Sequence, residues 1–207
     1  LVGAIEWLFG VFCSKSPGAE DDLLLLDSTP VECARSVETV RRSALADICG
    51  YGYCRSHSRW FWGCRLHLAC APDGTPRAVQ LAPADRPERE VALHMLPRAL
   101  RGGETIVCDK GYAGRDFARR VKDLGGTIVR PARADEEKKG PHLAPIRQRI
   151  ESVFWTCKDL LNLERHGART PRNLVVRILA RLLALSACIY LNHQLGRPSR
   201  AIVDYTA

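Results

Sequence analysis

The sequence predicts an α/β protein with one mixed sheet of about five strands flanked by helices. Short β-prone apolar segments alternate with stretches of helical periodicity, in the order strand, hairpin, helix, strand, helix, strand, helices. The chain has 207 residues and is 46% hydrophobic, which suits a single folded domain with a full core.

Two of the predicted strands end in an aspartate. Residues 23–26 are four leucines, which is typical of a strand buried on both faces, and Asp27 follows them. Residues 105–108, TIVC, form a second short β-prone segment that ends at Asp109. Pro30 and several arginines follow the first strand, so we expect an irregular loop with a short helical piece up to residue 58.

Residues 58–84 predict an antiparallel hairpin, because two β-prone runs flank the turn residues Pro72-Asp73-Gly74. Trp60 and Trp62 share one face of this hairpin by the two-residue period of a strand. We expect them to pack in the core or on the sheet face rather than to stack on nucleic-acid bases. Further patterns predict a helix at 86–101, a helix at 115–124 and a strand at 127–131.

The helix predicted at 146–158 has a narrow polar stripe beside an apolar arc. At about 100° per residue, Arg147, Glu151 and Lys158 lie within roughly 40° of one another. The adjacent arc is formed by Ile146, Ile150, Val153, Phe154, Cys157, Leu160 and Leu161. The stripe therefore lies at the edge of the core, where a catalytic carboxylate would be placed. The alternative is a surface ion pair between Arg147 and Glu151, which is worth a few tenths of a kcal/mol.

Asp27, Asp109 and Glu151 together predict a metal site. Carboxylates are hard, anionic ligands of the kind that Mg²⁺ accepts while it keeps several waters. A purely structural strand end would more often carry Asn, Gly or Ser. Phosphodiester cleavage places negative charge on the attacking and leaving oxygens, which two Mg²⁺ ions can stabilise. Asp27 would then bridge the ions, and Asp109 and Glu151 would each complete one side.

The composition favours a polyanionic partner and a reducing compartment. The formal net charge is +8 and the isoelectric point is about 9.2. The nine cysteines are scattered singly with no CxxC pair, which favours small buried thiols over disulfides. A zinc site at Cys54-x2-His57 and Cys64-x2-His67 is the weaker alternative, because Cys64 and His67 would point to opposite faces of one strand.

The two most apolar segments lie near the ends of the sequence. Residues 1–13 contain Glu6 and lack the basic start of a signal peptide, so we interpret residues 1–22 as the remnant of an upstream region or as a helix packed on the core. Arginines interrupt residues 174–191, which favours a buried helix over a membrane span. Thr170 is the predicted N-cap of that helix, with Pro171 at its first position.

The order of these motifs resembles that of the DDE transposases of bacterial insertion sequences. The matching parts are Asp27-Ser-Thr-Pro, the segment RWFWGCRLHL, Asp109-Lys-Gly-Tyr and Arg147-x3-Glu151-x6-Lys158. The acids are 82 and 42 positions apart (109 − 27 and 151 − 109). The family has a Tyr where this sequence has Ala144, so the departure concerns the phosphate contact of that Tyr and not the acids.

The resemblance implies a ribonuclease-H-like catalytic domain over residues 23–207. In this fold the first acid lies on the first strand, the second follows the fourth strand, and the glutamate lies on a late helix. The resemblance makes Asp27, Asp109 and Glu151 the catalytic and metal-binding residues, with two Mg²⁺ or Mn²⁺ ions. It also implies that Arg147 and Lys158 hold DNA phosphates, and that Lys110 and Tyr112 are weaker candidates for DNA contacts.

The activity implied by the resemblance is DNA transposition. Water would cut at the ends of the element, and the freed 3′-hydroxyl would then attack target DNA. The implied partner is double-stranded DNA, bound by a homo-oligomer in the bacterial cytoplasm, at the nucleoid and without a membrane. Two alternatives stay open, namely a nuclease of the same fold without strand transfer and a non-catalytic DNA-binding relic. The sequence contains no Ser/His/Asp order, Walker loop or dinucleotide fingerprint that would favour another chemistry.

Overall fold

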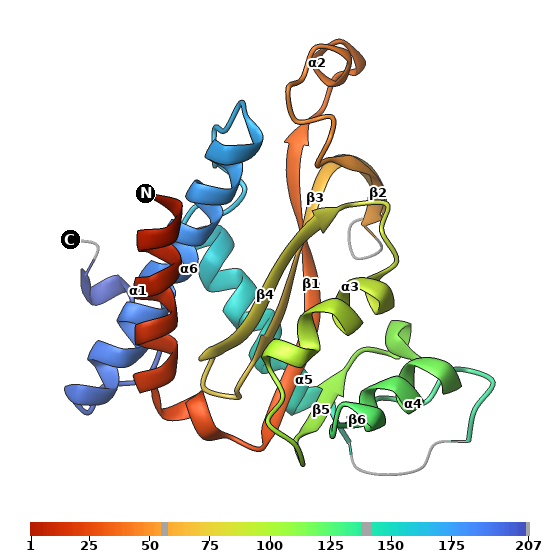
Figure 1. The fold of residues 1–207 in the computed structure, drawn as a ribbon, viewed down its shortest axis with the longest axis vertical. Coiled ribbons are helices and arrows are strands. Elements are labelled where there is room, and N and C mark those ends of the chain that lie inside the picture. Colours follow the sequence, from red (N-terminus) through yellow and green to blue (C-terminus); the bar gives the residue numbers. More distant parts are fainter. Residues whose placement is uncertain (55–57, 138–141, 206–207) are drawn as a thin grey trace.

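The computed structural model describes residues 1–54, 58–137 and 142–205 and is built around one mixed sheet (Figure 1). The sheet has six strands in the order β2-β3-β1-β5-β6, and β4 pairs with β3 as well. β3 is antiparallel to β1, β2 and β4, whereas β1, β5 and β6 are parallel. The strands are β1 (Leu23–Ala34), β2 (Gly50–Cys54), β3 (Arg59–Cys70), β4 (Pro76–Pro83), β5 (Thr105–Cys108) and β6 (Thr127–Val129).

Helices cover both faces of this sheet, which confirms the predicted α/β class (Figure 1). Alternate leucines of β1 serve two cores. Leu25 packs in the core that includes residues of α5 and α6, whereas Leu24 and Leu26 pack in the core that includes residues of α3 and α4. The helices are α1 (Val2–Lys15), α2 (Val37–Arg41), α3 (Glu88–Met95), α4 (Arg115–Asp123), α5 (Ala144–Trp155) and α6 (Pro171–Gln194).

The region between Asp27 and residue 58 is more regular than we expected. β1 does not stop at Pro30, which lies opposite Arg65 within the β1–β3 ladder. Proline has no N–H to donate to a neighbouring strand. Beyond Leu26, β1 is no longer paired with β5, so Pro30 can lie in the strand with its nitrogen on this unpaired edge. The segment GYGYC at 50–54 forms β2 instead of a loop, because β3 extends far enough to pair with it.

The hairpin prediction is confirmed, but its two tryptophans are in different environments. β3 and β4 pair from Cys64 to Cys70, and Gly74 in the turn has φ +100°, a conformation that favours glycine. Trp62 is 5% exposed and belongs to the core beside α5 and α6, as expected. Trp60 is 70% exposed, and its ring lies edge-on to Tyr53 of β2.

The N-terminal helix α1 packs along the C-terminal helix α6 (Figure 1). The rings of Phe12 and Tyr190 are 5.5 Å apart, and Cys13 Sγ lies 3.4 Å from Ser186 Oγ. α6 begins as predicted, with the Thr170 hydroxyl accepting from the Asn173 N–H. By length and composition alone α6 could cross a membrane. In its most apolar stretch of 18 residues, 44% is buried within the protein.

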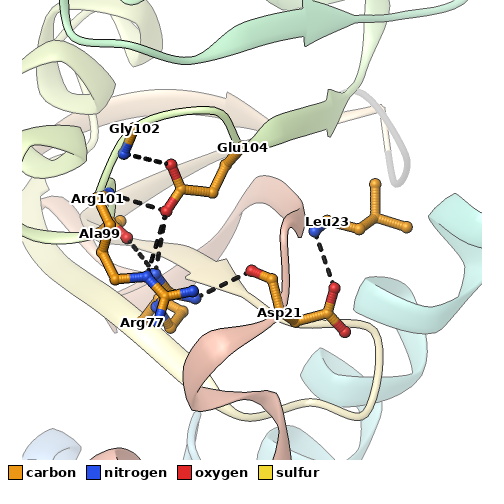
Figure 2. A network of polar contacts seen from close by, with 7 residues as sticks. All are labelled: Asp21, Leu23, Arg77, Ala99, Arg101, Gly102 and Glu104. Carbon is orange, nitrogen blue, oxygen red and sulfur yellow. Dashed lines mark hydrogen bonds and ion pairs between the residues drawn. The ribbon is translucent and has the colours of Figure 1, made fainter.

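A buried polar network fixes the strand ends opposite to those that carry the aspartates (Figure 2). Arg77 on β4 donates to the carbonyls of Asp21 and Ala99 at 3.1 and 2.8 Å and pairs with Glu104 at 3.3 Å. Glu104 also accepts from the N–H groups of Arg101 and Gly102. These contacts tie the residues that precede β1 and β5 to β4, so they help to set how β1 and β5 lie beside each other.

Candidate active site

Asp27 and Asp109 lie at the same edge of the sheet. β1 and β5 are parallel, and their last paired residues are Leu26 and Cys108, so each aspartate comes directly after that pair. The Ser28 N–H donates to Asp27 Oδ1 at 2.8 Å. Asp109 accepts from the Gly111 N–H and thereby caps the short turn that follows β5. The register thus brings together two carboxylates that are distant in the sequence.

Asp27 lies in an environment that disfavours its negative charge. The pKa of Asp27 is raised from 3.8 to about 7, mainly by burial and in addition by the carboxylates of Glu88 and Asp109. The hydrogen bond from Ser28 and the positive charge of Arg147 act in the opposite direction. A bound cation would relieve this crowding of negative charge, so the electrostatics of the pair suit a metal ligand.

We expect Asp27→Asn to stabilise the metal-free protein at pH 8. The folded-state pKa of Asp27 is raised, so the folded state favours the protonated carboxyl group. The stability that this group contributes is present below about pH 4 and is lost as pH rises towards 7. Because Asp27 is partly exposed, which weakens the effect, the gain should be on the order of 2 kcal/mol at pH 8. Urea unfolding in EDTA at pH 4 and pH 8 measures it. Equal stability of the two proteins at pH 8 would show that the negative charge of Asp27 is not unfavourable in the folded protein.

Glu88 is a further acid near the pair that the sequence did not single out. It lies in the first turn of α3, where Ser28 Oγ donates to its carboxylate at 2.6 Å and Arg65 pairs with it at 3.3 Å. In the sequence Glu88 is one of two acids at a helix start, which is the ordinary place for a carboxylate that favours the helix dipole. Only the fold places it beside β1.

Glu151 lies on α5, the helix that packs against β1 and β5. Its carboxylate is 3.7 Å from the guanidinium of Arg147, one turn earlier, and its side chain is 58% exposed. This is the ion pair that the polar stripe allowed as an alternative. Arg147 also acts on the charge of Asp27, so it connects the glutamate electrostatically to the aspartate pair.

Lys158 leaves the predicted stripe because the helix changes its winding. After Trp155 the chain forms a π-helical turn over Thr156–Leu160, which breaks the step of 100° per residue. Lys158 pairs with Glu164 at 2.9 Å, and its side chain is only 23% exposed. Its charge is therefore already matched by a neighbour and does not continue the Arg147–Glu151 surface.

The two weaker DNA candidates beside Asp109 differ in accessibility. Lys110 is exposed. Tyr112 is 1% exposed and packs against Phe117 in the core beside α3 and α4, with its ring 5.8 Å from the Phe117 ring. A DNA phosphate cannot reach the Tyr112 hydroxyl while the ring is in the core, so the structure corrects its assignment as a DNA contact.

The donor set at the strand ends fits a hard divalent cation, because Asp27 and Asp109 offer carboxylate oxygens at one edge. Within residues 1–54, 58–137 and 142–205, however, no three His, Cys, Asp or Glu side chains converge on a common metal position. The structure thus brings the aspartates together and leaves Glu151 paired with Arg147. For the zinc alternative, His57 lies outside the described residues.

Comparison with known proteins identifies the family. The sequence model of a family described as transposase DDE domain matches residues 18–187. No curated protein matches the sequence. The matched region includes every strand of the sheet and α5, and the mixed sheet flanked by helices agrees with the ribonuclease-H-like fold of DDE transposases. The chain therefore belongs to the DDE transposase family.

Proposed function

We propose that this chain cuts DNA at the ends of a mobile element and joins the freed 3′ ends to target DNA. The observation that carries the proposal is the parallel register of β1 and β5, which places Asp27 and Asp109 side by side with mutually unfavourable charges. DNA is the partner that membership of the family implies. Assembly as a homo-oligomer on DNA, an origin in a bacterial insertion sequence and a place at the nucleoid belong to the same proposal.

Asp27 and Asp109 would hold the divalent cation, Mg²⁺ or Mn²⁺, and Glu151 would approach from α5. When bound, two such ions stabilise charge on the attacking and leaving oxygens of a phosphodiester. The chain's own groups orient the ligands. The Ser28 N–H holds Asp27, and the Gly111 N–H holds Asp109. Arg147, whose positive charge acts on Asp27, would neutralise a DNA phosphate beside the carboxylates.

Replacing Arg147 by Ala should weaken DNA binding for all sequences and flatten its salt dependence by about one unit of slope. Lys158→Ala is the matched comparison, because Lys158 already pairs with Glu164 and should change the slope less. Fluorescence anisotropy with a labelled duplex over a salt series measures both slopes. An unchanged slope for Arg147→Ala would leave Arg147 as the partner of Glu151 alone.

A joining assay tests the function itself. The full chain is mixed with an end-labelled duplex and a supercoiled plasmid in Mg²⁺ or Mn²⁺. Transposition predicts plasmid nicking and covalent transfer of the labelled 3′ end into the plasmid. Nicking without transfer would favour the nuclease, and DNA binding without nicking in either metal would favour the non-catalytic relic.

A further inference from the structure

Three cysteines that the proposed DNA chemistry does not use meet on the side of the sheet covered by α5 and α6. Cys49 Sγ and Cys64 Sγ are 3.6 Å apart. Gly50 pairs with Gly63 in the β2–β3 ladder, so Cys49 and Cys64 are the next opposed pair in that register. Opposed residues have Cβ atoms about 4.5–5.5 Å apart, close to the roughly 3.5–4.5 Å of a disulfide. A small movement would let the two sulfurs bond.

Cys33 joins this pair through a β-bulge. The β1–β3 register shifts between Glu32 and Ala34, so Cys33 is the extra residue of the bulge. Gly63 permits the bulge, because a Cβ at that position would collide with the carbonyl oxygen of Val31. Cys33 is partly exposed, whereas Cys49 and Cys64 are buried. Solvent therefore reaches the cluster at Cys33.

The environment of Cys33 favours its thiolate. Hydrogen bonds with the thiols of Cys49 and Cys64, and then with His166, lower the pKa of Cys33 despite desolvation. Isolated buried cysteines behave in the opposite way, since burial raises the pKa of Cys108 and Cys157 to about 12. Cys33 is thus both the most accessible sulfur of the cluster and the one that most readily forms a thiolate.

His166 supports thiol chemistry here rather than metal binding. Its Nδ1 accepts from the Ala168 N–H at 3.1 Å, so the ring proton lies on Nε2. Nε2 is 3.1 Å from the Glu32 carbonyl oxygen and 3.8 Å from Cys33 Sγ. Both ring nitrogens are therefore engaged by the backbone, and the Nε2–H lies beside the sulfur that would carry negative charge.

We propose that Cys33, Cys49 and Cys64 form a thiol relay that reacts with hydroperoxides and ends in a Cys49–Cys64 disulfide. The Cys33 thiolate attacks the hydroperoxide, so that an S–O bond forms, the O–O bond breaks, and the leaving alkoxide or hydroxide takes up a proton. The Cys49 sulfur then attacks the Cys33 sulfenic acid, an S–S bond forms, and water leaves with the thiol proton.

The last step is thiol–disulfide exchange. Cys64 gives up its thiol proton and attacks the Cys49 sulfur, the Cys33–Cys49 bond breaks, and Cys33 departs as the leaving thiolate, which is favoured by its low pKa. The proton from Cys64 balances the one that the alkoxide or hydroxide took up in the first step. In total, two thiols are oxidised to one disulfide, and one hydroperoxide is reduced to an alcohol or water with release of a water. Cys33 is regenerated, so the relay moves oxidation from the accessible sulfur to the buried pair.

Peptide mapping of the full chain tests the relay. The protein is treated with hydrogen peroxide, its remaining thiols are alkylated, and it is digested with trypsin. Mass spectrometry should find peptide 43–55 joined to peptide 60–65 with the loss of two hydrogens, and reduction should separate them. Fragmentation distinguishes Cys49 from Cys54 within the first peptide. Absence of the Cys49–Cys64 link after peroxide treatment would overturn the proposal.

Variants test the order of the steps. Cys33→Ser should slow formation of the link by about tenfold or more, because it removes the reactive thiolate. Cys64→Ser should trap a Cys33–Cys49 disulfide. Cys13→Ser is the matched control, since Cys13 is also partly exposed but contacts Ser186 instead of a thiol, and it should leave the rate unchanged. A Cys33→Ser protein with a native circular dichroism spectrum and an unchanged rate would refute the relay.

An independent measurement guards against a Cys33 variant that does not fold. In Cys49→Ala/Cys64→Ala, the sulfenic acid at Cys33 has no resolving thiol, so dimedone should label Cys33 after peroxide treatment. Labelling at Cys33 in this variant supports the first step. Labelling at another cysteine, with none at Cys33, contradicts it.

Discussion

Asp27→Asn and Asp109→Asn are each expected to reduce metal-dependent DNA nicking by roughly a thousandfold or more, while DNA binding persists. The amide keeps the size of the side chain but removes the charge that would hold the cation. The losses should be similar and should not add in the double variant, because the two carboxylates lie at one sheet edge and would act as a unit. Plasmid nicking at fixed Mn²⁺ measures the rates, and anisotropy measures binding.

Controls for this experiment come from other acids of the chain. Asp116→Asn changes an exposed aspartate on α4 that pairs with Arg119, and it should nick like the unaltered protein. Glu151→Gln should be as damaged as the aspartate variants if Glu151 is the third ligand. Glu88→Gln tests the acid that the fold places near Asp27. Normal nicking by Asp27→Asn would remove Asp27 from the proposed site.

The second large effect is on stability, at the network of Figure 2. Glu104→Ala is expected to destabilise the fold by about 3–5 kcal/mol, because it leaves the positive charge of Arg77 buried without its carboxylate partner. Glu104 is 1% exposed, and the side chain of Arg77 is 8% exposed. The N–H groups of Arg101 and Gly102 also lose their acceptor. Urea unfolding gives the change in the free energy of unfolding.

A double variant separates the effect of the buried charge on stability from that of the lost side-chain volume, and a variant of an exposed ion pair serves as the control. Replacing both partners, as in Arg77→Met with Glu104→Leu, should recover much of the stability, since no uncompensated charge remains. Glu38→Ala breaks an exposed pair with Arg41 and should change stability by no more than about 0.5 kcal/mol. A loss for Glu104→Ala as small as that for Glu38→Ala would show that the network does not hold β1 and β5 in place.

The strands with strong local patterns could be predicted from the sequence, whereas strands that form only because a neighbouring strand pairs with them could not. The four leucines predict a strand buried on both faces, and in β1 alternate leucines do enter two cores. The segment GYGYC predicts a loop by its glycines, but it becomes β2 because β3 supplies a partner. Likewise, Pro30 suggested the end of β1, and the strand continues because one of its edges lacks a neighbour there.

The candidate site divides in the same way. That Asp27 and Asp109 meet follows from two strand ends, which the sequence pattern predicted, and from the parallel pairing of β1 with β5, which the pattern did not specify. The partner of Lys158 depends on a π-helical turn, which leaves no mark on the hydrophobic period. The approach of Glu88 to Ser28 joins segments 60 positions apart. No local signal encodes that contact or the meeting of the three cysteines.

Asp27 and Asp109 are proposed to hold a divalent cation, and the position of Mn²⁺ in a crystal would show whether they do. Crystals of the full chain would be soaked in Mn²⁺, and the anomalous difference density would locate the ion without reference to activity. We predict a peak coordinated by carboxylate oxygens of both Asp27 and Asp109, which is lost in Asp27→Asn. Density for Mn²⁺ elsewhere on the protein, with both aspartates ordered and without metal, would show that Asp27 and Asp109 are not the metal ligands.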